Sequence, residues 1–66
     1  MKLGDRIEIP AHYDLWMRGA RFGLVMAMRY NLEGGRYAKI KMDHPQVRKL
    51  VNLPEGDWNF AKVIER

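Results

Sequence analysis

The chain alternates apolar and polar residues over short runs that turn-forming residues interrupt. In the run 4–10, Ile7 and Ile9 share one face, and Pro10 ends the alternation. In the run 36–43 the alternation is unbroken. One face carries Ala38, Ile40 and Met42, and the other carries Tyr37, Lys39, Lys41 and Asp43. A period of two over several residues is typical of a strand with one buried face, so we predict two strands here.

Three further strands are expected from apolar runs bounded by turn residues. They cover residues 20–30, 47–53 and 61–65. Two glycines in the segment 31–35 supply positive φ for a turn, a tight turn occupies 44–46, and Pro-Glu-Gly-Asp at 54–57 ends the fourth strand. A single helical turn is expected at 58–60. The prediction is an all-β fold: one five-stranded barrel over residues 1–66, with one short helical turn before the last strand.

A helix is the competing interpretation only for residues 20–30. The stretch 26–29 (Met-Ala-Met-Arg) consists of good helix formers. Gly23 would interrupt such a helix at a cost of about 1 kcal/mol relative to alanine. Glycine or proline also recurs about every ten residues along the chain, so we favour strands throughout.

Several of these motifs resemble one fold family. They are Gly-Asp-Arg-Ile at 4–7, Gly-Leu-Val-Met-Ala-Met at 23–28, the alternating basic strand, and the closing Ala-Lys-Val-Ile-Glu at 61–65. Together they resemble SH3-like barrels, in particular KOW-type modules and small bacteriophage-encoded proteins. The spacing Gly23-x-Val25-x-x-Met28 resembles the KOW pattern, in which a bulge lets the second strand bend across both halves of the barrel. We therefore expect a close backbone approach at Gly23 and a bulge between Val25 and Met28.

A second resemblance is to plasmid-encoded type II dihydrofolate reductases, which are SH3-like barrels of similar length. It rests on Gly-Asp-Arg at 4–6, a glycine in the second strand, Glu-Gly at 33–34 before Tyr-Ala, and the closing Glu-Arg. In that family a Val-Gln-Ile-Tyr strand segment lines the pore of a tetramer. The corresponding segment here, 47–50, is Val-Arg-Lys-Leu, which places charge where cofactor and substrate would stack. Reductase activity therefore ranks third among the functions considered.

Composition favours binding over catalysis without deciding whether the protein is an enzyme. The 66 residues include no cysteine, serine or threonine, which excludes triad-type hydrolases and thiolate metal sites. We predict no catalytic residues and no cofactor. His12 with Asp14, and Asp43 with His44, are the only metal-like pairs, and no metal site is expected because a stable one needs three or four ligands. The absence of cysteine and of a long apolar segment favours a cytoplasmic protein with no membrane partner.

Charge is concentrated in the middle of the chain. The net charge is +4, but residues 18–49 alone carry eight basic and two acidic groups, a net +6. Such a block is typical of a surface that binds a polyanion, although it can also be an ordinary solvated face. We predict a nucleic-acid-binding face in which phosphate contacts dominate. Its residues would be Arg21, Arg29, Arg36, Tyr37, Lys39, Lys41, Arg48 and Lys49.

The loop 11–19 supports an alternative function in protein interaction or self-assembly. It displays Tyr13, Trp16 and Arg18, side chains that can hold a peptide. Trp16 can instead fold back to cap the small core, and Trp58 has the same two interpretations. A chain this short buries little apolar surface alone, so self-association into a homo-oligomer would also supply core. The partner is therefore nucleic acid or protein.

Overall fold

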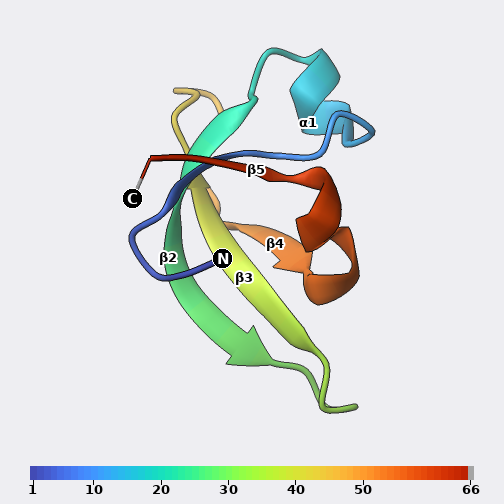
Figure 1. Ribbon diagram of the computed structural model, residues 1–66. Coiled ribbons are helices and arrows are strands. Elements are labelled where there is room, and N and C mark those ends of the chain that lie inside the picture. Colours follow the sequence, from blue (N-terminus) through green and yellow to red (C-terminus); the bar gives the residue numbers. More distant parts are fainter. Residues whose placement is uncertain (66) are drawn as a thin grey trace.

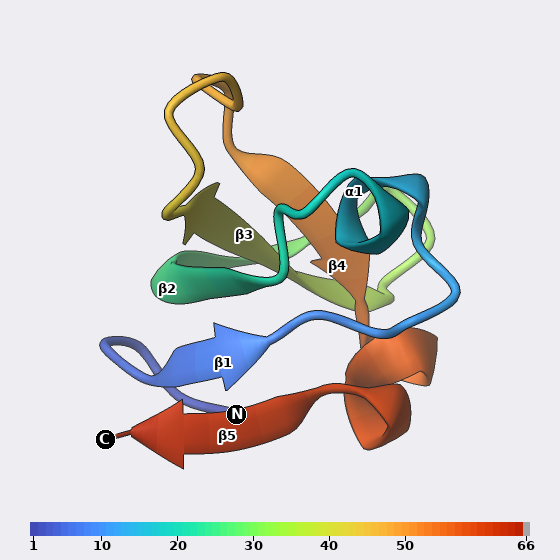
Figure 2. The same cartoon turned by 90° about the horizontal axis from the view of Figure 1, so that it is seen from above.

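The computed structural model describes residues 1–65, and most of its regular structure is β (Figure 1). The elements are β1 (Arg6–Glu8), α1 (Asp14–Met17), β2 (Phe22–Tyr30), β3 (Arg36–Met42), β4 (Val51–Pro54), the 3-10 helix η1 (Glu55–Phe60) and β5 (Lys62–Glu65). The five strands form one antiparallel sheet in the order β4-β3-β2-β1-β5. The sheet curls into a half-barrel consistent with an SH3-like fold, with β1 and β5 facing β2, β3 and β4 (Figure 2). The predicted five-stranded, all-β architecture is confirmed.

The β2–β3 hairpin is the longest part of the sheet, and its turn follows from two residues. Gly34 has a φ of +86°, which favours glycine. The Asn31 side-chain oxygen accepts hydrogen bonds from the backbone N–H groups of Glu33 (3.0 Å) and Gly35 (2.9 Å). An asparagine that bonds the backbone two residues ahead is a common turn device. The turn predicted at 31–35 is thus present.

The bend of β2 comes from a bulge at Met26. Val25 pairs with Ile40 and Ala27 pairs with Lys39, so Met26 is the extra residue on its strand. A bulge increases local twist and bends the strand that carries it. Because β2 pairs with β3 along its length and with β1 at its beginning, this bend curls the sheet over its own core. The predicted bulge is confirmed.

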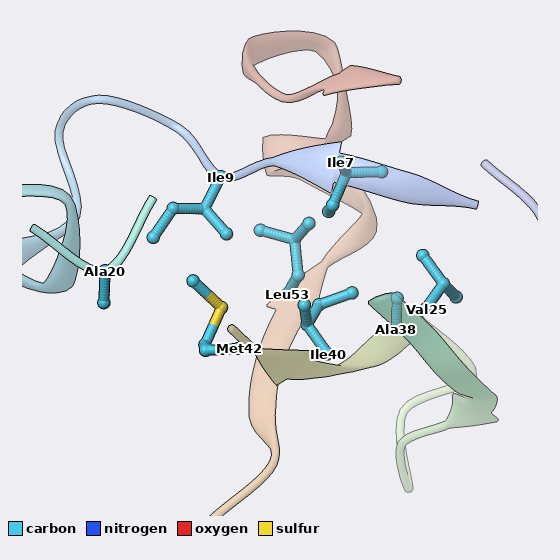
Figure 3. Packing of buried hydrophobic residues seen from close by; sticks show 8 residues of the cluster. All are labelled: Ile7, Ile9, Ala20, Val25, Ala38, Ile40, Met42 and Leu53. Atoms are coloured by element: carbon cyan, nitrogen blue, oxygen red, sulfur yellow. The ribbon is translucent and has the colours of Figure 1, made fainter. Parts of the chain in front are cut away.

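The core lies inside the curl and consists of eight apolar residues, each no more than 4% exposed (Figure 3). They are Ile7, Ile9, Ala20, Val25, Ala38, Ile40, Met42 and Leu53. The faces predicted to be buried in the first and third strands are the faces that supply five of these residues. At one end of the half-barrel the Trp58 ring packs against this core, and its Nε1–H donates to the Leu53 carbonyl oxygen (2.9 Å).

Several predicted boundaries are wrong. The first strand, expected over residues 4–10, covers only Arg6–Glu8. The fourth strand begins at Val51 rather than residue 47, because hydrogen bonds from the Gln46 and Val47 N–H groups to His44 hold the preceding residues in turns. The segment 11–19, expected to be a loop, contains the single turn α1. The helical turn before the last strand begins at Glu55 rather than residue 58. No helix in residues 1–65 is long and apolar enough to cross a membrane.

Candidate functional site

The eight residues predicted to bind nucleic acid lie in four separate places. Arg29, Tyr37, Lys39 and Lys41 lie on the outer face of the β2–β3 hairpin. Arg48 and Lys49 lie in the loop between β3 and β4, which Figure 1 shows at the end of the hairpin away from the 31–35 turn. Arg21 and Arg36 each contact a tryptophan. The structure therefore brings half of the predicted set onto one sheet face.

The sheet register explains why these four side chains share the outer face. Arg29 pairs with Tyr37 across the two strands, and Lys39 and Lys41 follow Tyr37 at steps of two along β3. The residues between them, Ala38 and Ile40, are fully buried. Side chains two residues apart on a strand point to the same side. The Lys39 ammonium lies 5.6 Å from the Tyr37 ring centroid, within reach of a cation–π contact.

The three cations of this face have no acidic partner among residues 1–64, whose side chains the structure describes. Arg29 and Lys41 are exposed and form no ion pair there. Lys39 donates only to the neutral side chain of Asn52, at 3.1 Å. The nearby carboxylate of Asp43 is itself neutralised by an ion pair with Arg6. The outer face therefore has uncompensated positive charge.

The same face carries an apolar stripe that the sequence analysis missed. Phe22, Leu24 and Met26 are 40%, 38% and 48% exposed, and they alternate along β2 with buried Gly23 and Val25. Leu24 pairs with Lys41, so the stripe adjoins the cations. We call Arg29, Tyr37, Lys39 and Lys41, together with Phe22, Leu24 and Met26, the hairpin face. In this strand both alternating sets are apolar, so no contrast in the sequence indicated which set faces out.

Arg36 does not belong to the hairpin face. Its Nε donates to a Glu55 carboxylate oxygen (2.9 Å), its guanidinium also forms an ion pair with that carboxylate, and it lies 5.1 Å from the centroid of the Trp58 ring. The hydrogen bond and the negative charge of Glu55 raise the pKa of Arg36. Arg36 therefore joins β3 to η1.

Arg21 is also engaged within the protein. Its guanidinium carbon stands 3.8 Å from the centroid of the Trp16 ring, and its Nε donates to the Trp16 carbonyl oxygen (3.2 Å). The ring of Trp16 packs against the core, and its Nε1 donates to Glu8 (3.3 Å). Arg21 thus covers the tryptophan that covers the core.

The residues proposed for protein interaction are only partly available. Trp16 and Tyr13 both pack against the core, which is the capping alternative for this segment. The Tyr13 hydroxyl donates to the Asp57 carboxylate of η1, and His12 Nε2 lies 3.9 Å from the same carboxylate. Arg18 is exposed at the end of α1 and faces the β3–β4 loop across a groove. Of the three, Arg18 alone has a side chain that forms no hydrogen bond or ion pair with the described side chains, so it is available to a partner molecule.

The Tyr13–Asp57 contact gives a pH-dependent prediction. Burial, the hydrogen bond to Asp57 and its negative charge together hold the pKa of Tyr13 well above its ordinary value of 10.0. As the pH rises, Tyr13 therefore ionises in the unfolded chain before it ionises in the folded protein. The stability that the Tyr13–Asp57 contact contributes is present below about pH 10 and falls as the pH rises further. We expect Tyr13→Phe to lower the free energy of unfolding by about 1 kcal/mol at pH 7. Urea denaturation should show that the free energy of unfolding falls more between pH 8 and pH 11 in the wild type than in Tyr13→Phe.

The comparison between the two proteins isolates Tyr13, because every other residue is the same in both. Parallel losses of stability between pH 8 and pH 11 would show that Tyr13 ionises equally easily in the folded and unfolded chains, contrary to the prediction.

The acidic residues are dispersed over separate contacts. Glu55 pairs with Arg36, whereas Asp57 faces Tyr13 and His12, so the two carboxylates of the 54–57 turn serve different neighbours. Within residues 1–64, no three histidine or acidic side chains approach closely enough to hold a metal ion. The carboxylates of Glu55 and Asp57 thus join η1 to β3 and to the segment that enters α1.

Two further observations concern relatives. Residues 47–50, the segment that the resemblance aligned with the pore strand of type II dihydrofolate reductases, precede β4 and form no strand. Comparison with protein-family models, with curated proteins and with solved structures finds no match to this chain. The fold remains a half-barrel consistent with an SH3-like fold, and any proposal on function rests on the chain's own surfaces.

Proposed function

We propose that this protein is a small binding module that contacts single-stranded nucleic acid through the hairpin face. The observation that carries the proposal is the placement of Arg29, Lys39 and Lys41, free of acidic partners in the described chain, beside aromatic rings on one face. Lysine and arginine contact phosphates, and aromatic rings stack on bases. The bulge at Met26 also supports the finer resemblance to KOW-type modules.

A single strand fits this surface better than a duplex. Phe22 and Tyr37 are the aromatic rings of the face, and rings stack on bases only where those bases are unpaired. Lys39 and Lys41 are spaced along β3 so that both can follow one phosphate backbone, roughly 7 Å apart at the usual strand rise. The expected binding is weak, tolerant of sequence and sensitive to salt.

The test is a fluorescence-anisotropy titration with a labelled oligothymidylate of about 20 nucleotides. At about 50 mM salt we expect saturable binding by the wild type. If three cations contact phosphates, log K against log salt should have a slope of about −2, since each contact on a single strand contributes about −0.7. The double variant Arg29→Gln/Lys41→Gln should bind at least tenfold more weakly, with a slope reduced to about −0.7.

The matched control is Arg48→Gln/Lys49→Gln, which removes the same charge from the β3–β4 loop. It should retain most of the affinity if binding is local to the hairpin face. Equal losses in the two variants would show that net charge alone attracts the oligonucleotide. Absence of binding by the wild type at about 50 mM salt would remove the proposal altogether.

The apolar stripe supports a second candidate function, which is self-association or protein contact through β2. Phe22, Leu24 and Met26 form a continuous exposed row, as interface residues do. Sedimentation of the same samples decides between the two candidates. A stable dimer that Leu24→Lys converts to a monomer would place a second protein on the hairpin face in place of nucleic acid.

A further inference from the structure

A groove separates α1 from the β3–β4 loop, away from the 31–35 turn of the hairpin. Its volume is about 420 Å³, within the range of about 300–1,000 Å³ usual for ligand sites. Leu15, Ala20 and Val47 line it and pack against the core, so they form an apolar floor. Figure 2 shows α1 and the loop on either side of this region, projecting from the same side of the sheet.

The rim of the groove is cationic on both sides. Arg18 stands on the α1 side, and Arg48 and Lys49 stand on the loop side; all three are exposed. None of them forms an ion pair with another side chain of residues 1–64, and none of the residues lining the groove is acidic. Asp43, which borders the adjoining hollow, is paired with Arg6. Charge complementarity therefore calls for an anionic occupant.

The floor decides which kind of anion fits. The lining includes no phenylalanine, tyrosine or tryptophan, and the Nδ1 of its one ring, that of His44, accepts a hydrogen bond from the Gln46 N–H (3.2 Å). A base stacks on a ring or a guanidinium plane, and the floor offers neither, because both arginines stand on the rim. A floor of leucine, alanine and valine instead accepts an aliphatic side chain. Cations on two walls suit carboxylates that flank this side chain on both sides.

We propose that the groove binds an acidic peptide segment that carries one aliphatic side chain between carboxylates. The aliphatic side chain lies on Leu15, Ala20 and Val47, and the carboxylates pair with Arg18 on one wall and with Arg48 and Lys49 on the other. The site is distinct from the hairpin face, so a single domain can hold a nucleic-acid strand and an acidic protein partner at the same time. The inference stands whether or not the hairpin face binds nucleic acid.

The test uses a fluorescein-labelled peptide, Asp-Glu-Leu-Glu-Asp, and its Asp-Glu-Ala-Glu-Asp counterpart of equal charge. In anisotropy titrations at about 50 mM salt we expect the wild type to bind the leucine peptide saturably, and the alanine peptide about tenfold more weakly because less apolar surface is buried. The double variant Arg48→Gln/Lys49→Gln should bind the leucine peptide about five- to tenfold more weakly than the wild type. Arg29→Gln/Lys41→Gln, with the same net charge, should leave its affinity unchanged.

Amide chemical shifts locate the bound peptide. The leucine peptide should move the signals of Ala20 and Val47, whereas the oligothymidylate should move those of β2 and β3. Three results would overturn the proposal: no saturable binding, equal affinity for the two peptides, or equal weakening by the two double variants. Movement of the Ala20 and Val47 signals by the oligonucleotide alone would reassign the groove to nucleic acid and overturn it as well.

Discussion

Gly23→Ala is expected to remove most of the stability of this protein. A β-carbon at this position would lie 2.6 Å from Ile40 Cγ2 and 2.8 Å from the Lys41 carbonyl oxygen. Ile40 is fully buried, and the Lys41 carbonyl belongs to the strand backbone, so neither can move aside cheaply. Forcing extra volume into a packed core costs about 1–3 kcal/mol, and a core of this size supplies roughly 3–5 kcal/mol in all. We expect a loss of about 3 kcal/mol in the free energy of unfolding, measured by urea denaturation.

Gly56→Ala is the matched control, since a β-carbon there has no neighbour within 4 Å and the residue has no positive φ. Its free energy of unfolding should change by no more than about 0.5 kcal/mol. If the two variants were equally stable, β2 and β3 would have to separate at Gly23 without loss. The close approach of the two strands would then contribute nothing to the fold.

The parts of the fold that the sequence predicted are those where the two faces of a strand differ in chemistry. In β3, buried Ala38 and Ile40 alternate with the two lysines, so one arrangement alone keeps the charges in water. The hairpin turn was equally predictable, because an asparagine at 31 and a glycine at 34 act locally. Local signals of this kind need no knowledge of the partner strand.

The hairpin face could be predicted only in part, because β2 is apolar on both sides. Nothing within the strand distinguishes Phe22 and Leu24 from Val25. The distinction comes from Gly23, whose missing side chain lets β3 approach on the inner side and so turns its neighbours outward. The glycine and the bulge were both recognised, but their consequence for the outer face depends on the pairing of two strands.

The basic residues predicted to form one face lie in different places, because tertiary contacts decide where a flexible cationic side chain lies. Arg21 and Arg36 were predicted as parts of one site, yet each finds a tryptophan that α1 or η1 brings beside it. Arg48 and Lys49 were expected on a strand, but the β3–β4 pairing extends only to Val51, opposite Ile40. The groove they share with Arg18 joins residues thirty positions apart, and no local pattern in the sequence indicates it.

Leu53→Ala is the second substitution with a large expected effect. Leu53 is fully buried, and Figure 3 shows it in the middle of the cluster between Ile7 and Ile40. Truncating a buried leucine costs about 2–5 kcal/mol, because contacts are lost and a cavity remains. Its carbonyl also accepts the hydrogen bond of the Trp58 indole, so a shift of the β4 backbone would loosen η1. We expect a loss of about 3 kcal/mol, measured by urea denaturation with both circular dichroism and tryptophan fluorescence.

Leu32→Ala makes the same chemical change at a fully exposed position in the β2–β3 turn, and it should alter stability by no more than about 0.5 kcal/mol. The two spectroscopic transitions of Leu53→Ala should coincide if β4, η1 and the rest of the sheet unfold as one unit. A fluorescence transition at lower urea than the circular-dichroism transition would contradict this, because Trp58, Trp16 or both would then leave the core before the sheet unfolds. Coincident transitions would mean that the 66-residue chain needs the edge strand β4 and the Trp58 contact to keep its sheet folded.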